Sequence, residues 1–404
     1  MRDTICMRPA EKADLDAGFY KAFGAQPARY FSAPGRTEIS GNHTDHQRGC
    51  VLAAAVDLHT RAAVTENGTN TIRIQSKGYP LIEIMLTDLP PVEAEKNTTA
   101  ALIRGVAARF AQLGCKVGGF DAYIESSVLP GSGLSSSAAF EVLLGTIINH
   151  LFYEGKAAQP EIAKIGQYAE NVFFGKPCGL MDQMASAVGG MVYIDFADKE
   201  NPVITPLEFD FSKTGYALCI IDSGADHADL TDEYAAIPAE MRAVSRCFGK
   251  EVLREVAEEE FYVNLPAVRE QCGDRAVLRA MHIFAENRRV KKQVEALQTG
   301  NFGEFLRLVN ESGRSSWLYL QNVLPTGSAK QQAVAVALAL CEKYLQGRGA
   351  CRVHGGGFAG TVQAFVPLDA VEDFRENMEN ALGKGACHIL SVRPQGGVEM
   401  KEKC

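Results

Sequence analysis

The chain has 404 residues, more than a single hydrophobic core usually supports, so two domains are expected. Hydrophobic residues make up 46% and charged residues 22% of it, an ordinary balance for a globular enzyme. The net charge of −8 argues against nucleic acid or an anionic membrane as a partner, although a local cationic pocket can still bind a nucleotide.

Cysteine spacing and hydropathy indicate the compartment. Eleven cysteines are scattered along the chain without a Cys-x-x-Cys pair, so neither a disulfide framework nor a zinc ribbon is indicated, and most should be reduced thiols. The N-terminal segment has no apolar stretch of signal-peptide length, and the most apolar run, Ala333 to Cys341, is too short to span a bilayer. A cytoplasmic protein is therefore expected.

The first distinctive segment is residues 34–50, which reads PGRTEISGNHTDHQRGC. Polar side chains of both signs are concentrated here beside an apolar run, which predicts a ligand-binding loop leading into a strand. His43, His46 and Cys50 also have the spacing of half a zinc site, but no second pair completes it. A loop whose polar groups only bond one another is the more serious alternative.

Residues 51–124 read as mixed strand and helix. Strands are predicted at 51–58, 71–75 and 81–86, with Asn67-Gly68 as a hairpin turn. Apolar residues three or four apart predict a helix over 98–113, and a further strand follows at 119–124.

Residues 130–139, PGSGLSSSAA, form a glycine-rich loop that runs into a helix with the apolar stripe Ala139, Val142, Leu143 and Ile147. Glycines let the backbone approach a ligand closely, and the free NH groups at a helix start attract an anion such as phosphate. A serine-capped helix after a flexible loop would give the same pattern. The lysine of a Walker-type loop is missing, and so are the paired motifs of protein kinases.

Two carboxylates follow. Glu170 lies near the end of a helix predicted at 161–174, and Asp182 comes twelve residues later. Phosphoryl transfer needs one carboxylate for Mg²⁺ and often another to orient or deprotonate the attacking hydroxyl. The alternatives are a solvated glutamate on a helix face and an aspartate that caps a helix.

A buried strand is predicted at 191–196, and the stretch around 200–212 is the best domain boundary. We therefore expect domains at 1–205 and 206–404. The second domain reads as a strand at 217–223 followed by mostly helix, until residues 355–366 and a strand at 387–392.

Together these segments resemble the galactokinases, a family of the GHMP kinase superfamily. PGRTEISGNHTDHQRG, LPGSGLSSSAA, AENVFFGKPCGLMDQ and, at 354–361, HGGGFAGT occur in the family's order, and the resemblance covers nearly the whole chain. It implies an α+β fold with an N-terminal domain like domain 2 of ribosomal protein S5, a C-terminal ferredoxin-like domain, and an active site in the cleft between them. The implied activity is ATP- and Mg²⁺-dependent phosphorylation of the anomeric hydroxyl of galactose by a monomer.

The resemblance also implies roles for individual residues. Asp182 would face the anomeric hydroxyl as base or orienting group, and Arg36 would stabilise the charge that develops during transfer. Ser136 and Glu170 would bind Mg²⁺. The ATP phosphates would lie against Gly131, Gly133, Ser135, Ser136 and Ser137, and the sugar against Asn42, His43, Asp45, Gly179 and Tyr234.

This chain departs from the family pattern at several positions. The family usually has Glu where Asn42 stands, near the sugar's C6 hydroxyl, and a neutral amide there would no longer repel a carboxylate such as that of galacturonate. Glu38 replaces a usual Asn, and His46 replaces a usual Tyr. The segment TTAALIRG lacks an expected aromatic residue, so no adenine-binding residues are assigned.

Two alternatives to galactokinase therefore stay open. One is another anomeric sugar kinase, acting on galacturonate, an N-acetylhexosamine such as N-acetylgalactosamine, or arabinose. The other is a sugar and ATP sensor without turnover, although such relatives carry a damaged serine loop and this chain keeps GLSSSAA.

Overall fold

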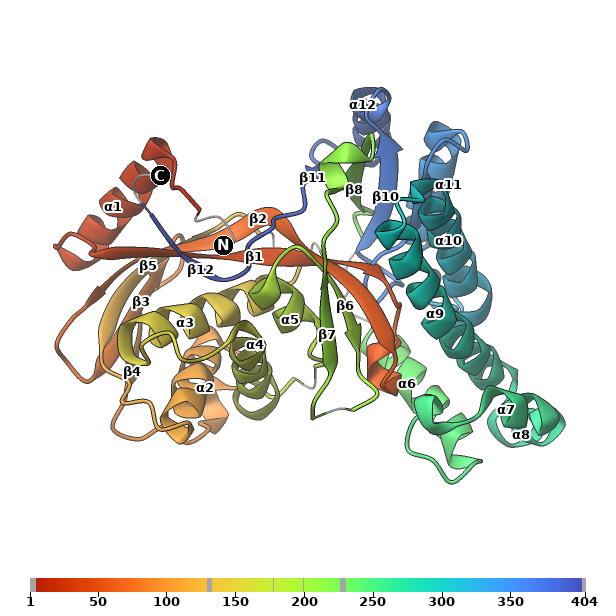
Figure 1. Ribbon diagram of the computed structural model, residues 1–404, viewed down its shortest axis with the longest axis horizontal. Coiled ribbons are helices and arrows are strands. Elements are labelled where there is room, and N and C mark those ends of the chain that lie inside the picture. The colour runs from red at the N-terminus through yellow and green to blue at the C-terminus, as the bar shows by residue number, and fades with distance from the viewer. Residues whose placement is uncertain (1–4, 129–132, 177, 199, 226–229, 402–404) are drawn as a thin grey trace.

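The computed structural model describes residues 5–128, 133–176, 178–198, 200–225 and 230–401, in which two β-sheets are flanked by helices (Figure 1). The strands are β1 (Arg29–Ser40), β2 (Cys50–Glu66), β3 (Thr71–Ser76), β4 (Ile82–Met85), β5 (Phe120–Ser126), β6 (Met191–Asp195), β7 (Val203–Leu207), β8 (Tyr216–Asp222), β9 (Ala350–Val353), β10 (Thr361–Pro367), β11 (Cys387–Leu390) and β12 (Val398–Met400). The α-helices are α1 (Pro9–Phe23), α2 (Thr99–Gln112), α3 (Ser136–Phe152), α4 (Gln159–Tyr168), α5 (Met181–Val188), α6 (Thr231–Arg246), α7 (Glu258–Val263), α8 (Leu265–Cys272), α9 (Asp274–Gln298), α10 (Phe302–Ser315), α11 (Ala333–Leu345) and α12 (Val371–Leu382).

The larger sheet has the strand order β12-β1-β2-β5-β3-β4. In addition, β6 pairs with the first residues of β2, from Cys50 to Ala54, and β7 pairs with β6. Helices α2 to α5 lie together below it in Figure 1 and bury its inner face. Side chains alternate across a strand, and Val51 and Ala53 of β2 accordingly both enter this core. The predicted apolar stripe of α3 is buried, which confirms that helix.

The smaller sheet is antiparallel, in the order β11-β8-β10-β9. Helices cover both faces of this sheet, as the alternating side chains of strand β8 show. Leu218 and Ile220 pack in a core with residues of α9 and α10, whereas Cys219 and Ile221 pack with α11 and α12. Helices α9, α10 and α11 stand side by side at this end of the molecule (Figure 1).

Two local predictions were wrong. Residues 34–40 belong to strand β1 and are not a loop, because their polar side chains are buried against partners from the smaller sheet. Asn67-Gly68 does not close a hairpin, since β5 lies between β2 and β3, antiparallel to the first and parallel to the second. The turn is nevertheless tight: Gly68 has φ +65° and Asn67 Oδ1 accepts from the amide of Thr69 at 3.0 Å.

The expected boundary at 205/206 falls inside β7, which pairs with β6 of the larger sheet. The chain's end also returns to that sheet, because β12 pairs antiparallel with β1 and places Met400 opposite Tyr30. Among the residues that the structure describes, nine cysteines are free thiols. Within the described ranges, none of the helices combines the length and the apolar character needed to cross a membrane.

Candidate active site

The segment 354–361 is the turn between β9 and β10, and it joins the three sequence motifs. His354 Nε2 accepts from the backbone amide of Glu38 (3.3 Å) and lies 3.0 Å from Thr37 Oγ1. Its Nδ1 lies 2.9 Å from Thr361 Oγ1. Burial, reinforced by the charges of nearby arginines, lowers the pKa of His354 well below its ordinary value, so the ring is neutral and Nδ1 carries the proton.

The described part of the glycine-rich segment, which starts at Gly133, packs directly on this turn. A Cβ at Gly133 would lie 3.0 Å from His354 Nδ1 and 2.9 Å from Thr361 Oγ1, and Gly133 has φ +72°. The amide of Arg36 also donates to the carbonyl of Leu134 (3.0 Å). The second motif is therefore held between the first and the third.

Arg36 and Asp182 form a bidentate ion pair where the motifs meet. Arg36 Nε donates to Asp182 Oδ1 at 2.7 Å and Nη2 to Oδ2 at 2.5 Å, while Nη1 bonds the carbonyl of Gly133. The side chain of Asp182 is 30% exposed and that of Arg36 10%, so the carboxylate is the more accessible partner.

The electrostatic surroundings keep that carboxylate charged. Burial would raise the pKa of Asp182, but the Arg36 charge and hydrogen bonds from Arg36 and Ser135 outweigh it and hold the pKa below its ordinary value. Asp182 is accordingly ionised at neutral pH. The helix-cap alternative does not describe it, since its side chain bonds Arg36 rather than the backbone amides of α5.

The start of α3 has the geometry expected of an anion site. Ser135 precedes the helix with φ +55°, and Ser136 and Ser137 form its first turn with half-buried side chains. Backbone NH groups at such a helix start have no intrahelical partner and carry the positive end of the helix dipole. Gly131, also predicted to contact phosphate, lies outside the described residues.

Glu170 lies in a π-helical turn, Ala169–Phe174, and is buried, which rules out the solvated-face alternative. Gln183 donates from Nε2 to Glu170 Oε2 (2.8 Å) and to Glu141 Oε2 (2.9 Å). Lys176 Nζ lies 3.8 Å from Glu170 Oε1. Burial and the charge of Glu170 raise the pKa of Glu141 well above its ordinary value.

The residues predicted to contact the sugar come together beside the Gly355–Gly357 turn. His43 Nε2 donates to the carbonyl of Gly356 (3.1 Å), and the Tyr234 hydroxyl donates to that of Gly357 (2.8 Å). Burial and the neighbouring His46 lower the pKa of His43 to about 4, and burial raises the pKa of Tyr234 to about 12. Both side chains are therefore neutral at pH 7.

Asp45 and Gly179 are also in contact. A Cβ added at Gly179 would lie 2.4 Å from Asp45 Oδ2, so only glycine lets the carboxylate occupy this position. Gly179 lies three residues before Asp182, so its contact with Asp45 brings that carboxylate near the ion pair, and the Asp45 charge is among those that raise the pKa of Arg36.

Asn42 is the exception among the predicted sugar contacts, because it is completely buried. Its Nδ2 donates to Glu38 Oε1 (3.1 Å) and to the carbonyl of Gly355 (2.6 Å), and its Oδ1 accepts from Asn322 Nδ2 (2.8 Å). Both amide hydrogens therefore have partners within the protein.

The zinc alternative finds no support in the geometry. The rings of His43 and His46 are 6.0 Å apart, and the Cys50 thiol is 3.1 Å from the Tyr193 hydroxyl. Nowhere in the part of the chain that the structure describes do three or more His, Cys, Asp or Glu side chains form a group that could hold a metal ion. Mg²⁺ places a smaller demand on the protein, since one or two carboxylates together with substrate phosphates suffice.

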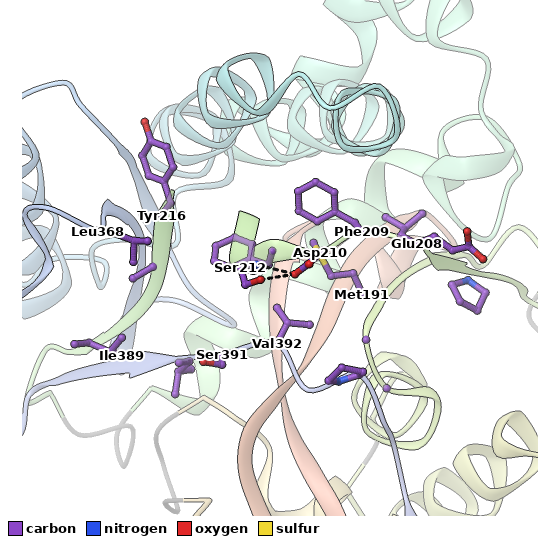
Figure 2. A pocket seen from close by; sticks show the side chains of 18 residues that line it. Met191, Glu208, Phe209, Asp210, Ser212, Tyr216, Leu368, Ile389, Ser391 and Val392 are labelled. Atoms are coloured by element: carbon purple, nitrogen blue, oxygen red, sulfur yellow. Dashed lines mark hydrogen bonds between the residues drawn. The ribbon is translucent and has the colours of Figure 1, made fainter. Parts of the chain in front are cut away.

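A separate cavity of about 720 Å³ lies between the two sheets, lined by Met191, Phe209, Tyr216, Leu368, Val392 and thirteen other residues (Figure 2). None of the predicted site residues that are described lines it. The hydrogen bonds drawn in Figure 2 are internal to the lining: Asp210 Oδ1 accepts from the amide (3.1 Å) and the hydroxyl (2.6 Å) of Ser212. We place the functional site at the convergence of polar groups around Arg36 and Asp182, because a catalytic site requires such groups.

Known proteins resemble both the motifs and the whole chain. The GHMP kinases N terminal domain matches residues 101–190, and the galactokinase galactose-binding signature matches residues 17–66. Galactokinase of Streptomyces coelicolor is 30% identical over 94% of this chain and 96% of its own length, and that of Actinobacillus pleuropneumoniae is 32% identical over 96% and 98%. The chain belongs to the galactokinase family.

Solved structures agree on the fold of this galactokinase-family chain. Lactococcus lactis galactokinase complexed with galactose superimposes with a TM-score of 0.80 at 24% identity, covering 96% of this chain and 99% of that one. L. major mevalonate kinase in complex with R-mevalonate gives a TM-score of 0.60 at 15% identity, over 92% and 99%. The predicted α+β GHMP kinase fold is confirmed, and a kinase of this family uses ATP as a substrate.

Sequence reasoning missed several residues of this galactokinase-family site. Gln183 directly follows Asp182, and Glu141 lies in the helix after the serine loop, but neither stood out from its surroundings. Arg352 was missed too, although an arginine in the apolar strand ACRV is a signal of a buried ion pair. Its partner is Glu38, one of the positions where the chain departs from its family.

Proposed function

We propose that the protein is an ATP-dependent galactokinase that phosphorylates the anomeric hydroxyl of α-D-galactose. The observation that carries the proposal is the Arg36–Asp182 ion pair, which lies between the helix start suited to phosphate and the predicted sugar residues. Phosphoryl transfer depends mainly on positioning and on stabilising charge, and this arrangement supplies both.

The pKa of Asp182 defines its part in the reaction. An ionised carboxylate accepts a hydrogen bond from the attacking hydroxyl and orients it toward the γ-phosphorus. Its lowered pKa makes it a weak base, so the hydroxyl proton moves to it only as the new P–O bond forms. Arg36 keeps its positive charge beside this centre, since Asp182 raises its pKa despite burial.

Mg²⁺ binding by Glu170 and Ser136 is part of the proposal. Carboxylate and hydroxyl oxygens suit this hard cation, and Glu170 Oε1 makes a looser contact, with Lys176 Nζ at 3.8 Å, than Oε2 makes with Gln183 at 2.8 Å. When bound, Mg²⁺ would neutralise negative charge on the β- and γ-phosphates. Gly133, Ser135, Ser136 and Ser137 would supply the neighbouring phosphate contacts.

Galacturonate is a second candidate substrate, because residue 42 is a neutral amide and the nearby Glu38 carboxylate is paired with Arg352. The non-catalytic sensor is less well supported, since the chain keeps the Arg36–Asp182 ion pair and the serines that begin α3. A cytoplasmic location and a monomeric state stay predictions.

The decisive experiment measures ADP release with ATP and Mg²⁺ over galactose, galacturonate, N-acetylgalactosamine, arabinose and glucose, with the product identified by phosphorus NMR. Galactose should give the highest kcat/KM and a 1-phosphate. A clear preference for galacturonate would replace the substrate but keep the chemistry. Sugar binding without any turnover would favour the sensor.

A further inference from the structure

The Gly355–Gly357 turn exposes three consecutive carbonyl groups, and each accepts a hydrogen bond from a side chain of another segment. Asn42 bonds Gly355 (2.6 Å), and Tyr234 of α6 bonds Gly357 (2.8 Å). The carbonyl of Gly356 accepts from both His43 (3.1 Å) and Asn322 (3.1 Å). The turn is thus held both by residues that follow β1, Asn42 and His43, and by residues of the second half of the chain, Tyr234 and Asn322.

The backbone of this turn favours glycine. Gly355 has φ +66° and Gly357 has φ +81°, a region that other residues rarely adopt. A Cβ at Gly357 would also lie 2.0 Å from the carbonyl oxygen of Asn322, which accepts from the amide of Phe358 (2.5 Å). A glycine-rich backbone loses much conformational freedom when it is ordered, so the side-chain bonds to the three carbonyls add to the backbone bonds of Phe358 and Ala359 in holding this conformation.

Behind the turn, Asn42 is held by a buried ion pair between the two sheets. Arg352 of β9 is fully buried and its Nη2 bonds Glu38 Oε1 of β1, the same oxygen that accepts from Asn42 Nδ2. The other donors of Arg352 bond the carbonyls of Ile39 and Val353, both at 2.9 Å. A buried charge pair with all of these bonds made has little freedom to move.

We infer that Arg352, Glu38 and Asn42 are positioning residues: they fix the Gly355–Gly357 turn beneath His43 and Tyr234 and do not themselves touch the sugar. The inference rests on the proposed function for its catalytic consequence, and it replaces the expectation that Asn42 binds substrate. Loss of Asn42 should then loosen the turn and weaken the use of every sugar by a similar factor, whichever hydroxyl the sugar carries.

The first test uses Asn42→Ala with galactose, 2-deoxygalactose and 6-deoxygalactose. The expected result is a fall in kcat/KM of about tenfold or more that is equal, within twofold, for all three sugars, and that is mostly a rise in KM. If the loss disappears for one deoxy sugar, Asn42 bonds that missing hydroxyl directly and the inference is overturned.

The second test needs no turnover. Hydrogen exchange of the backbone amides in 354–361 is measured without sugar, and Asn42→Ala should accelerate it at least tenfold at the Phe358 amide. Glu38→Gln keeps an acceptor for Asn42 and Arg352 although it removes the charge, so it should accelerate exchange clearly less than Glu38→Ala does. Asn149→Ala is the matched control, because Asn149 is also buried and bonds backbone groups, those of Ala157.

The outcomes separate the possibilities. Acceleration of equal size in Asn149→Ala would mean general loosening and would overturn the inference, as would unchanged exchange in Asn42→Ala. Should the wild-type protein phosphorylate none of these sugars, the proposed function fails, but the exchange experiment still decides whether Asn42 fixes the turn. If Asn42→Ala does not fold, comparing hydrogen exchange in Glu38→Gln and Glu38→Ala still decides whether these residues fix the turn.

Discussion

Arg36 and Asp182 face each other with two parallel hydrogen bonds, 2.7 Å from Nε to Oδ1 and 2.5 Å from Nη2 to Oδ2. They are 146 residues apart in sequence and come from strand β1 and helix α5. A bidentate pair fixes the plane of the carboxylate as well as its charge. The orientation of Asp182 therefore depends on Arg36.

Asp182→Asn should lower kcat by about 10² to 10⁴, the usual contribution of a positioned proton-transfer group, while sugar binding changes little. The amide keeps the shape of the carboxylate but loses its charge and one acceptor position toward Arg36. Stopped-assay kinetics would give kcat, and calorimetry would give the galactose Kd. Unchanged turnover in this variant would refute the role given to Asp182.

Gly179→Ala should raise the KM for the sugar roughly tenfold with a smaller effect on kcat, because the new Cβ meets Asp45 Oδ2 at 2.4 Å and displaces that carboxylate. Gly303→Ala is a suitable control. In α10 its Cβ would approach no closer than 3.9 Å, to Asn301 Oδ1. Equal KM values in the two variants would show that Asp45 can move without consequence for the sugar.

Glu170→Gln should raise the Mg²⁺ concentration needed for half-maximal rate by about tenfold or more, because a neutral amide binds this cation far less well than a carboxylate. Mn²⁺ binding with a non-hydrolysable ATP analogue, followed by electron paramagnetic resonance, gives a readout that does not depend on turnover. If both measurements match the wild type, the metal is held elsewhere.

Sequence periodicity was sufficient to predict those helices and strands whose buried residues follow a regular spacing within the element itself. The helix predicted at 98–113 is α2, Thr99–Gln112, and the strand at 51–58 is part of the longer β2. Strand β1 was missed because Thr37 and Glu38 are polar, and their partners His354 and Arg352 are more than 300 residues away. No local pattern contains such contacts.

The same reason explains which parts of the site could be predicted. Asp182, Arg36 and the serines that begin α3 lie in motifs with a recognisable order, so they were found, although their assigned roles stay predictions. The pairing of β2 with β5 was not found, because turn chemistry at Asn67-Gly68 does not reveal which strand inserts between its flanks. The burial of Asn42 depends on Asn322 and Gly355, both remote in sequence.

Glu38 and Asn42 are both departures from the family, and their side chains contact each other at 3.1 Å. The resemblance to the galactokinases implies Asn at position 38 and Glu at position 42, so this chain would carry the acid and the amide in exchanged positions. Glu38→Asn alone should cost about 3–5 kcal/mol of unfolding free energy, because the buried Arg352 loses its carboxylate. Asn42→Glu alone should also destabilise, by placing two carboxylates side by side.

The double variant Glu38→Asn/Asn42→Glu should be more stable than the sum of the single effects predicts, by about 1 kcal/mol or more, because an acid and an amide again face each other. Urea unfolding of all four proteins measures this coupling. Additive effects would mean that neither substitution compensates for the other.

Glu286 gives the protein an acid-sensitive contribution to stability. It is fully buried and accepts from the Ser312 hydroxyl (2.6 Å) and the amide of Gly41 (3.2 Å), with Arg289 as its ion-pair partner. Burial would raise its pKa, but the charges of Arg289 and other nearby cations outweigh this and lower the pKa to about 2. The folded state therefore prefers the ionised form.

Because the folded pKa lies below the unfolded value of about 4.3, this stabilisation is complete above that pH and is lost as the pH falls toward 2. It amounts to about 3 kcal/mol. Urea midpoints of the wild type and Glu286→Gln should therefore differ most at pH 6 and converge as the pH falls from 4.5 to 3. Glu259→Gln, at an exposed position, should follow the wild type throughout. A wild-type advantage that persists undiminished at pH 3 would show either that Glu286 stays ionised in the unfolded chain or that its contribution does not depend on charge.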